Sequence, residues 1–368
     1  MMDASSRQSR AWQRYHMDTP LFIGLLSLSV MGLIVLYSAG GQNIDLILRQ
    51  MLRLGIGFIV MFAVAQITPQ QLSRWSLWAY GIGLSLLLLV LLGGEMGKGA
   101  QRWLDLGFVR FQPSEIMKIA VPLLIARYMA SQPMPPKLSV VIFAATLIGI
   151  PTFMIMKQPD LGTSLLIAFS GVFVLLFAGL RWRYIFTVLG SISVAAPFIW
   201  GLLHTYQKNR VLTFINPERD PLGTGYHIIQ SKIAIGSGGM YGKGWLNGTQ
   251  AHLDFLPERT TDFIFAVASE EFGLLGVLVL LTAFMFIVFR GIYIAIQAQD
   301  SFSRLLAGSI TLTFFIYFFI NIAMVSGILP VVGLPLPLVS YGGTSMVTLM
   351  ASFGILMSIQ THRKLVAT

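Results

Sequence analysis

The sequence predicts an all-α polytopic membrane protein with about ten transmembrane helices. Of its 368 residues 55% are hydrophobic and only 11% are charged, whereas roughly a quarter of the residues in a soluble domain carry a charge. The apolar residues also gather in runs of about 20, the length that a helix needs to cross a bilayer core. The chain has no cysteine, which excludes disulfides and Cys-ligated metal sites.

Ten segments are long and apolar enough to be predicted as membrane spans. They cover residues 20–38, 49–67, 75–94, 113–130, 138–156, 160–179, 184–203, 263–289, 303–325 and 340–360. The polar residues 1–19 and 361–368 are predicted to form tails, and residues 204–261 a long loop between the seventh and eighth helices. We therefore expect a single membrane domain over residues 1–368.

The distribution of Lys and Arg predicts which way the helices run. Alternate connections hold most of the basic residues, namely Arg7, Arg10, Arg14, Arg74, Arg127, Lys137, Arg181, Arg183, Arg290, Arg304, Arg363 and Lys364. Because basic connections tend to stay in the cytoplasm, we expect both termini there and the 204–261 loop outside. The same rule accounts for the formal charge of +10 without a nucleic-acid partner.

The unusual sequence gathers where the fourth, sixth, eighth and tenth helices begin, all on the predicted outer side. These motifs are "RFQPSEIMK", "KQPDLGTS", "PERTTDFIF" and "PLPLVSYGGTS". A helix N-terminus offers unpaired N–H groups and a partial positive charge. Any chemistry is therefore expected at the outer face, near the membrane surface.

A cluster of basic residues surrounds the start of the fourth helix. Lys98, Arg102, Arg110 and Lys118 lie on the side where positive charge is normally sparse. They indicate a cationic site for a phosphorylated ligand, because Arg binds phosphate oxygens bidentately and Lys acts as a point charge. A structural role stays open, since Glu115 and Lys118 are spaced i, i+3 and can pair on one helix face.

Two further motifs allow both a structural and a functional interpretation. Asp160 in "KQPDLGTS" can cap the sixth helix or line a site. Prolines and glycines interrupt the apolar segment Ser326–Ser345. We predict a re-entrant loop that lines a site, because irregular backbone at membrane depth is tolerated only where protein or a cavity satisfies it. An ordinary outer loop is the alternative.

The long outer loop contains the amphipathic run Tyr226–Ile235. This run is too short to span the membrane, so we predict a helix that lies at the interface. The glycine-rich tract that follows matches neither nucleotide-binding fingerprint. Its glycines are expected to permit tight turns.

The eighth predicted helix begins beside an acidic residue, Asp262, and carries two more, Glu270 and Glu271. A charged group costs about 3 kcal/mol or more at the bilayer centre, so we expect Asp262 at a helix start near the surface, where it stays ionised. Thr260 and Thr261 stand beside it and can cap the helix equally well. Glu270 and Glu271 follow about 12 Å further along the helix. We expect them deeper in the bundle, in packing or polar pairing.

Five motifs, in this order, resemble the SEDS (shape, elongation, division and sporulation) family. They are "KGAQRWLDLGFVRFQPSE", "QPDLGTS", "DPLGTGYHIIQSKIAIGSGG", "FLPERTTDFIFAVASEEFG" and "GLPLPLVSYGGTS". The match runs from about Met17 to Lys364, and the motif spacing is closer to the elongation member than to the division member. One departure is Thr260, where the family often has a His.

The resemblance implies a membrane glycosyltransferase that polymerises lipid II into peptidoglycan strands in the bacterial cytoplasmic (inner) membrane. It implies work beside a class B penicillin-binding protein and other elongation proteins, and it places the family's essential carboxylate on Asp262. The expected substrate-binding residues are Arg102, Arg110, Glu115, Lys118, Asp160, Arg210, Lys232, Ser340 and Tyr341. No metal site or cofactor is predicted, and a need for a divalent cation stays open.

The chemistry of this reaction agrees with one general base. The donor sugar of lipid II is linked to its diphosphate in the α sense and the product is β-linked, so one inverting displacement suffices. Asp262 would then take the proton from the attacking sugar hydroxyl.

Two other functions stay open. Membrane carboxylates and broken helices also suit a lipid II flippase, although polar residues are scarce in the inner loops and the two halves show no inverted-repeat symmetry. A non-enzymatic scaffold for a transpeptidase would leave the concentrated outer charges unexplained.

Overall fold

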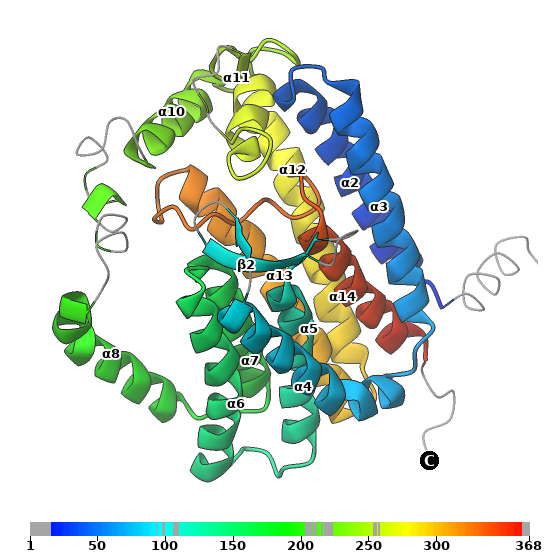
Figure 1. The fold of residues 1–368 in the computed structure, drawn as a ribbon. Helices are drawn as coiled ribbons and strands as arrows, with labels where there is room; N and C mark the ends of the chain where they lie inside the picture. Colours follow the sequence, from blue (N-terminus) through cyan, green and yellow to red (C-terminus); the bar gives the residue numbers. More distant parts are fainter. Residues whose placement is uncertain are drawn as a thin grey trace, which may run out of the picture.

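A computed structural model describes residues 16–93, 95–97, 100–105, 110–202, 208, 212–214, 216, 224–252, 256 and 258–362. The described residues form ten long helices: α2 (Thr19–Ala39), α3 (Ile44–Ala65), α4 (Pro69–Gly93), α5 (Pro113–Ala130), α6 (Leu138–Lys157), α7 (Leu161–Phe177), α8 (Trp182–Leu202), α12 (Ile264–Gln297), α13 (Ser301–Val325) and α14 (Thr344–Thr361). Nine of them pack into a bundle, and α8 stands apart from it to one side (Figure 1). Seven of them are long and apolar enough to cross a membrane, and α7 is a shorter apolar helix.

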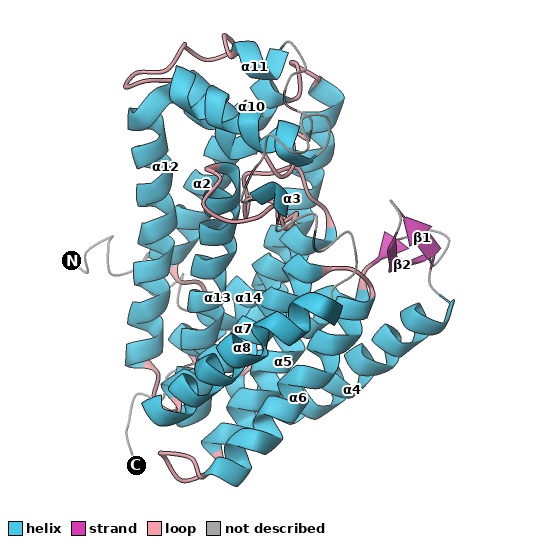
Figure 2. Ribbon diagram, turned by 90° about the vertical axis from the view of Figure 1, so that its left-hand side faces the viewer, coloured by secondary structure: helices cyan, strands magenta, loops and turns pink. Residues whose placement is uncertain are grey.

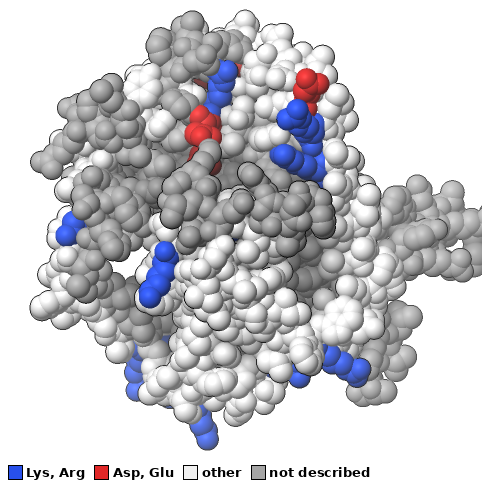
Figure 3. Space-filling view, viewed as in Figure 1, with Lys and Arg blue, Asp and Glu red and all other residues white. Residues whose placement is uncertain are grey.

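These ten helices coincide with the ten predicted segments, so the predicted all-α multi-pass membrane fold is confirmed. On the face shown in Figure 3, most of the described surface carries no charged side chain. Of the two predicted tails, 1–19 and 361–368, residues 1–15 and 363–368 lie outside the described part of the chain.

The largest differences lie at two helix boundaries. α4 begins at Pro69 rather than near residue 75, because its first turn is helical although it is polar. α12 is assigned as far as Gln297, beyond the predicted end at 289. Arg290 had indicated the end of the span, but its guanidinium pairs with Asp18, with Nε 3.0 Å from Oδ1. This neutralises the charge, and the helix continues.

A small antiparallel sheet between α4 and α5 has no counterpart in the sequence prediction. Its strands are β1 (Glu95–Gly97), β2 (Ala100–Asp105) and β3 (Arg110–Phe111), in the order β1-β2-β3. Figure 2 shows β1 and β2 projecting from one side of the helices. Strand β2 of this sheet places Arg102 and Trp103 near the start of α5, where they line the cavity described below.

The helices α10 (Thr224–Ser237) and α11 (Thr249–His252) lie across one end of the bundle (Figure 2). α10 confirms the helix predicted at Tyr226–Ile235. Its Ser231 hydroxyl donates to Val325 O, 2.8 Å away at the end of α13. We call this end, where α2 and α13 finish and α14 begins, the site end.

The segment assigned as α12 reverses its direction at Gly273, where φ is 62° and ψ is −163°. Asn321 of α13 donates to Asp262 O at 2.9 Å. Phe318, one turn away on α13, stacks on Phe284 with ring centroids 4.5 Å apart. A straight helix would hold Asp262 and Phe284 about 33 Å apart.

Both contacts can form only if residues 264–272 and 274–297 run side by side in opposite directions. We call residues 264–272 the re-entrant helix. Its turn at Gly273 lies at the site end, because Glu271 accepts a hydrogen bond from Ser38, next to the last residue of α2. Asp262 therefore lies on the bundle side of that turn.

Candidate active site

A cavity of about 240 Å³ opens at the site end, where six elements meet. It is lined from β2 and α5, from the start of α7, from α13, from the loop between α13 and α14, and from the start of α14. The lining residues include Arg102, Trp103, Gln112, Glu115, Lys118, Asp160, Thr163, Tyr317, Gly333, Leu334 and Ser345. Four of the residues predicted to bind substrate therefore share one cavity.

Asp160 and Arg102 form one wall of this cavity. Asp160 caps α7 by accepting from Thr163 N at 3.2 Å, and its other oxygen accepts from the Gln112 amide at 3.0 Å. Arg102 Nε lies 4.0 Å from Asp160 Oδ2 and donates to Gln158 O at 3.2 Å. The capping role predicted for Asp160 is confirmed, and the same residue also faces the cavity.

Glu115 and Lys118 form a buried ion pair on α5, with 2.8 Å between Lys118 Nζ and Glu115 Oε1. The predicted i, i+3 pair is therefore present, and it is buried, because the Glu115 and Lys118 side chains are only 4% and 12% exposed. Lys118 also lies over the Tyr317 ring, 5.5 Å from its centroid. The positive charge of Lys118 therefore lies at the wall of the cavity, paired with the carboxylate of Glu115.

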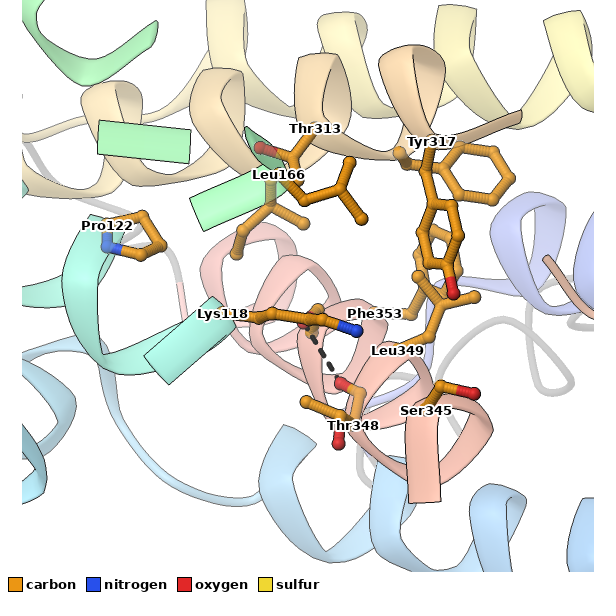
Figure 4. Close-up of a pocket in the computed structure, with 12 residues that line it drawn as sticks. Lys118, Pro122, Leu166, Thr313, Tyr317, Ser345, Thr348, Leu349 and Phe353 are labelled. Carbon is orange, nitrogen blue, oxygen red and sulfur yellow. Dashed lines mark hydrogen bonds between the residues drawn. The ribbon is translucent and has the colours of Figure 1, made fainter. Parts of the chain in front are cut away.

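A second, smaller cavity of about 40 Å³ lies beside this pair, between α5, α13 and α14. Figure 4 shows the Lys118 ammonium pointing between Tyr317 and Thr348. Thr313 and Ser345 line the same space. A cavity of this size has room for a few waters at most, and its lining is mostly apolar.

Residues 326–343 form a loop without helix or strand that descends into the bundle, and we call it the re-entrant loop. A β-carbon at Gly32 would lie 2.6 Å from Leu338 O. Gly32 stands seven residues before the end of α2, about 10 Å along that helix. Leu338 and Ser340 are each 3% exposed. The predicted re-entrant loop that lines a site is confirmed.

Ser340 and Tyr341 tie this loop to the residues before Asp262. The Ser340 hydroxyl accepts from Leu336 N at 2.7 Å and donates to Thr261 O at 2.5 Å. Tyr341 N donates to Thr260 O at 2.8 Å. Both residues, predicted to bind substrate, thus fix the backbone that leads into Asp262.

Asp262 stands where the re-entrant helix begins, beside the re-entrant loop. A β-carbon at Gly333, a cavity residue, would lie 3.6 Å from Asp262 Oδ2. Tyr317 interacts electrostatically with Lys118, Glu115 and Asp262. Asp262 is half-buried, and it is not the N-cap of α12, because that position belongs to Phe263. Its carboxylate therefore belongs to the surroundings of the cavity.

The predicted depths of the three acids were wrong. Glu270 and Glu271 do not lie deeper than Asp262, because the re-entrant helix runs toward the site end. Glu270 instead pairs with Lys243 at 2.7 Å, and Glu271 accepts from Ser38. Their predicted polar pairing is confirmed. The sequence misled us because a re-entrant helix followed by a span reads as one long apolar run.

The remaining predicted residues lie in different places. The Lys232 side chain is exposed and covers Gly327 at the end of α13, where a β-carbon would lie 2.2 Å from Lys232 Cε. The side chain of Arg110 and the whole of Arg210 lie outside the described part of the chain.

Sequence reasoning missed two residues of α3 that support the re-entrant loop. Gln50 is 1% exposed and donates to Ser340 O at 3.1 Å. Arg53 stacks over the Tyr341 ring, with Cζ 4.4 Å from its centroid. A polar amide and a guanidinium inside a predicted span are a usable signal, because such residues in a membrane helix often mark a functional site.

Comparisons with known proteins agree with this geometry. The family model described as cell cycle protein, FtsW/RodA/SpoVE, matches residues 18–365. The chain is 52% identical over 357 residues to the peptidoglycan glycosyltransferase MrdB of Escherichia coli K12, covering 97% of this chain and 96% of that relative.

Two solved structures are similar over most of their length. The rod shape determining protein RodA of Thermus thermophilus has a TM-score of 0.72 at 26% identity, covering 94% of this chain and 98% of that one. A chain from a structure that concerns coordination of polymerization and crosslinking by a peptidoglycan synthase complex has a TM-score of 0.83 at 31% identity. That match covers 95% of this chain and 99% of the other.

Proposed function

The chain belongs to the FtsW/RodA/SpoVE family of cell cycle proteins and is a peptidoglycan glycosyltransferase, and we propose that it polymerises lipid II with Asp262 as the general base. One observation carries this assignment. The Asp262 carboxylate lies beside Gly333, which lines the same cavity as Arg102 and Lys118. An acid that can accept a proton thus stands beside a cavity whose wall also holds cations that can bind a diphosphate.

The proposed reaction is one inverting displacement. The 4-hydroxyl oxygen of the acceptor sugar attacks the anomeric carbon of the donor, and the bond to the donor's diphosphate breaks. Asp262 takes the hydroxyl proton as the new β-linked bond forms. The electron pair of the broken bond leaves with the polyprenyl diphosphate.

Arg102 and Lys118 are proposed to stabilise the leaving diphosphate. Arg102 is about one-third exposed at the cavity. The N–H groups of its guanidinium that do not bond to the protein can donate to phosphate oxygens. Lys118 supplies a point charge from inside the bundle, with Glu115 holding it in place at 2.8 Å. Developing negative charge is best stabilised by groups already oriented toward it.

The position of Asp262 fits a general base better than a helix cap. The capping position is Phe263, so the carboxylate is not needed there. Asn321 holds Asp262 O at 2.9 Å, and Tyr341 and Ser340 hold the two preceding residues. A general base has to be held at hydrogen-bond distance from its proton, and these contacts fix its backbone from two sides.

The setting of the enzyme follows from the resemblance and the orientation rule. We propose that the site faces outward from the bacterial cytoplasmic membrane, with both termini in the cytoplasm and the growing glycan strand outside. The similarity to a chain of a peptidoglycan synthase complex supports a class B penicillin-binding protein as partner, together with other elongation proteins. A divalent-cation requirement can be tested with EDTA and Mg²⁺ in the assay below.

Purified protein incubated with labelled lipid II tests the function. We expect ladders of glycan strands on a gel, without any partner protein that polymerises lipid II. Movement of labelled lipid II across a vesicle membrane without polymer would instead establish a flippase. If neither occurs and a bound transpeptidase is recovered, the chain is a scaffold and the proposal is wrong.

A further inference from the structure

Glu270 is a buried carboxylate that the mechanism above does not use. Its side chain is 0% exposed and lies near the end of the re-entrant helix. Its Oε1 accepts from Lys243 Nζ at 2.7 Å, from Thr249 N and Oγ1 at 2.9 Å each, and from Gln250 N at 3.1 Å. Lys243 belongs to the loop that joins α10 to α11, and Thr249 and Gln250 are the first two residues of α11.

The backbone of that loop is joined to the same turn. Lys243 N and Gly244 N donate to the carbonyls of Glu270 and Glu271 at 3.0 Å, while Leu274 N donates to Gly239 O at 2.9 Å. Residues 239–244 and 270–275 thus form a junction on which the re-entrant helix ends.

Glycine makes this close approach possible. A β-carbon at Gly242 would lie 2.1 Å from Glu271 O, and one at Gly273 would lie 2.3 Å from Gly242 N. Both residues have positive φ, 78° and 62°, which glycine adopts without strain. The glycine-rich tract therefore serves this junction as well as the turns that the sequence predicted.

The re-entrant helix connects the junction to Asp262. Residues 263–271 are all buried, and Glu270 stands eight residues after Asp262, about 12 Å along the helix. A short, fully packed helix behaves as a rigid rod. Its position is therefore set at one end by the Glu270 contacts and at the other by Asn321 and the re-entrant loop.

We propose that Glu270 is a positioning residue that holds Asp262 at its working distance from the acceptor sugar, an inference that rests on the proposed role of Asp262. A carboxylate fits this task because it can accept several hydrogen bonds at once. A glutamine offers one acceptor oxygen and would turn an NH₂ group toward the other donors. A displacement of about 1 Å at a reacting group can lower a rate about 10²-fold.

The first test is the variant Glu270→Gln in the full-length purified protein with labelled lipid II. We expect kcat to fall about 10- to 100-fold, with KM for lipid II unchanged, because Arg102 and Lys118 are untouched. The matched variant Lys243→Met removes one donor and leaves the backbone donors in place, so we expect a smaller fall in kcat. A rise in KM with unchanged kcat would contradict a positioning role.

A disulfide gives the decisive second test. The chain has no native cysteine, and Leu275 N donates to Met240 O at 3.2 Å while both side chains are exposed. The substitutions Met240→Cys and Leu275→Cys place one thiol on each half of the junction, and the loss of free thiol on oxidation shows whether the covalent link forms. Oxidation should restore most of the kcat lost in Glu270→Gln and have little effect when Glu270 is present.

The outcomes separate this inference from the proposed function. If the cross-link forms in Glu270→Gln, the protein is monodisperse and kcat stays low, Glu270 does not act through the junction. If Glu270→Gln has wild-type kinetics while Asp262→Asn is inactive, only the positioning role is wrong. Wild-type activity in Asp262→Asn would overturn the role of Asp262 itself. If Glu270→Gln folds only when cross-linked, recovered activity in that form still supports the inference.

Discussion

At the residue scale, Arg102 both bonds to the protein backbone and lines the cavity, and its substitution is expected to change the kinetics. Its guanidinium donates to Gln158 O and Pro159 O, which leaves other donors of its five for a ligand. For Arg102→Gln we expect KM for lipid II to rise and kcat to fall, so that kcat/KM drops about 10- to 100-fold, which corresponds to the loss of a charge-assisted hydrogen bond of about 1.5–3 kcal/mol. Steady-state kinetics of polymer formation measure this.

The control for Arg102 is Lys157→Gln. Lys157 is an exposed cation at the end of α6, stacked 4.9 Å from the centroid of Phe153, and it does not line the cavity of about 240 Å³. Its removal should leave KM unchanged. Equal effects of the two substitutions would indicate general surface attraction in place of a diphosphate contact.

His16 and His362 join the two ends of the described chain. Their rings stack with centroids 3.9 Å apart. Burial, and secondarily the nearby His362, lowers the pKa of His16 below its ordinary value of 6.5. Since protonation then favours the unfolded state, this stability is fully present above about pH 6.5 and is lost as the pH falls through the lowered pKa.

We therefore predict that acidification from about pH 7.5 to 5.5 lowers the thermal unfolding midpoint more in the wild type than in His16→Gln. Differential scanning fluorimetry of the two proteins in detergent measures this. A parallel loss in both would show that other groups cause the pH dependence.

Charged residues are conspicuous in a chain of this composition, and four of those predicted from the sequence lie together in the structure. Arg102, Glu115, Lys118 and Asp160 indeed meet at one cavity. The sequence did not indicate the uncharged residues that contact them or support the neighbouring loop. Gln50, Tyr317 and Asn321 lie inside predicted spans, and only the packing of α3 and α13 around the re-entrant loop gives them a role.

At the scale of elements, the length of the apolar runs predicted the helices but not the reversal inside one of them. The segment from Ile264 to Gln297 is apolar almost throughout, and Gly273 is one of 36 glycines in the chain. Its role becomes visible only from the contacts on either side, with Asn321 and with Phe318. The small sheet was missed for a similar reason, since its strands have at most six residues.

The reversal predicts that Gly273→Ala is severely disruptive. Its φ of 62° would be strained for alanine, by about 1–3 kcal/mol, and its β-carbon would lie 2.3 Å from Gly242 N. We expect a lower unfolding midpoint and loss of polymerisation. Unfolding and lipid II assays on the purified variant measure both.

The control is Gly81→Ala in α4, where a β-carbon meets no heavy atom within 4 Å. Here alanine should be neutral or stabilise the helix by about 0.5–1 kcal/mol. If Gly273→Ala behaves like this control, residues 264–297 form a continuous helix and the reversed arrangement is wrong.

At the scale of the whole molecule, the ten helices with basic connections on one side predict a fixed orientation. A reporter enzyme inserted after Gly248, in the loop that carries α10 and α11, should be active only outside the cytoplasm. One fused after Thr368 should be active only inside. Reporters in intact cells measure this, and an external C-terminus would place the cavity on the side where no glycan strand grows.

The general-base role of Asp262 is the central claim, and Asp262→Asn tests it most directly. Asparagine keeps the shape of the side chain and removes its basicity. With saturating labelled lipid II, we predict that polymerisation by the purified variant falls about 10²- to 10⁴-fold, while its unfolding midpoint and its lipid II binding stay close to those of the wild type. Glycan synthesis at a near-wild-type rate would contradict the account.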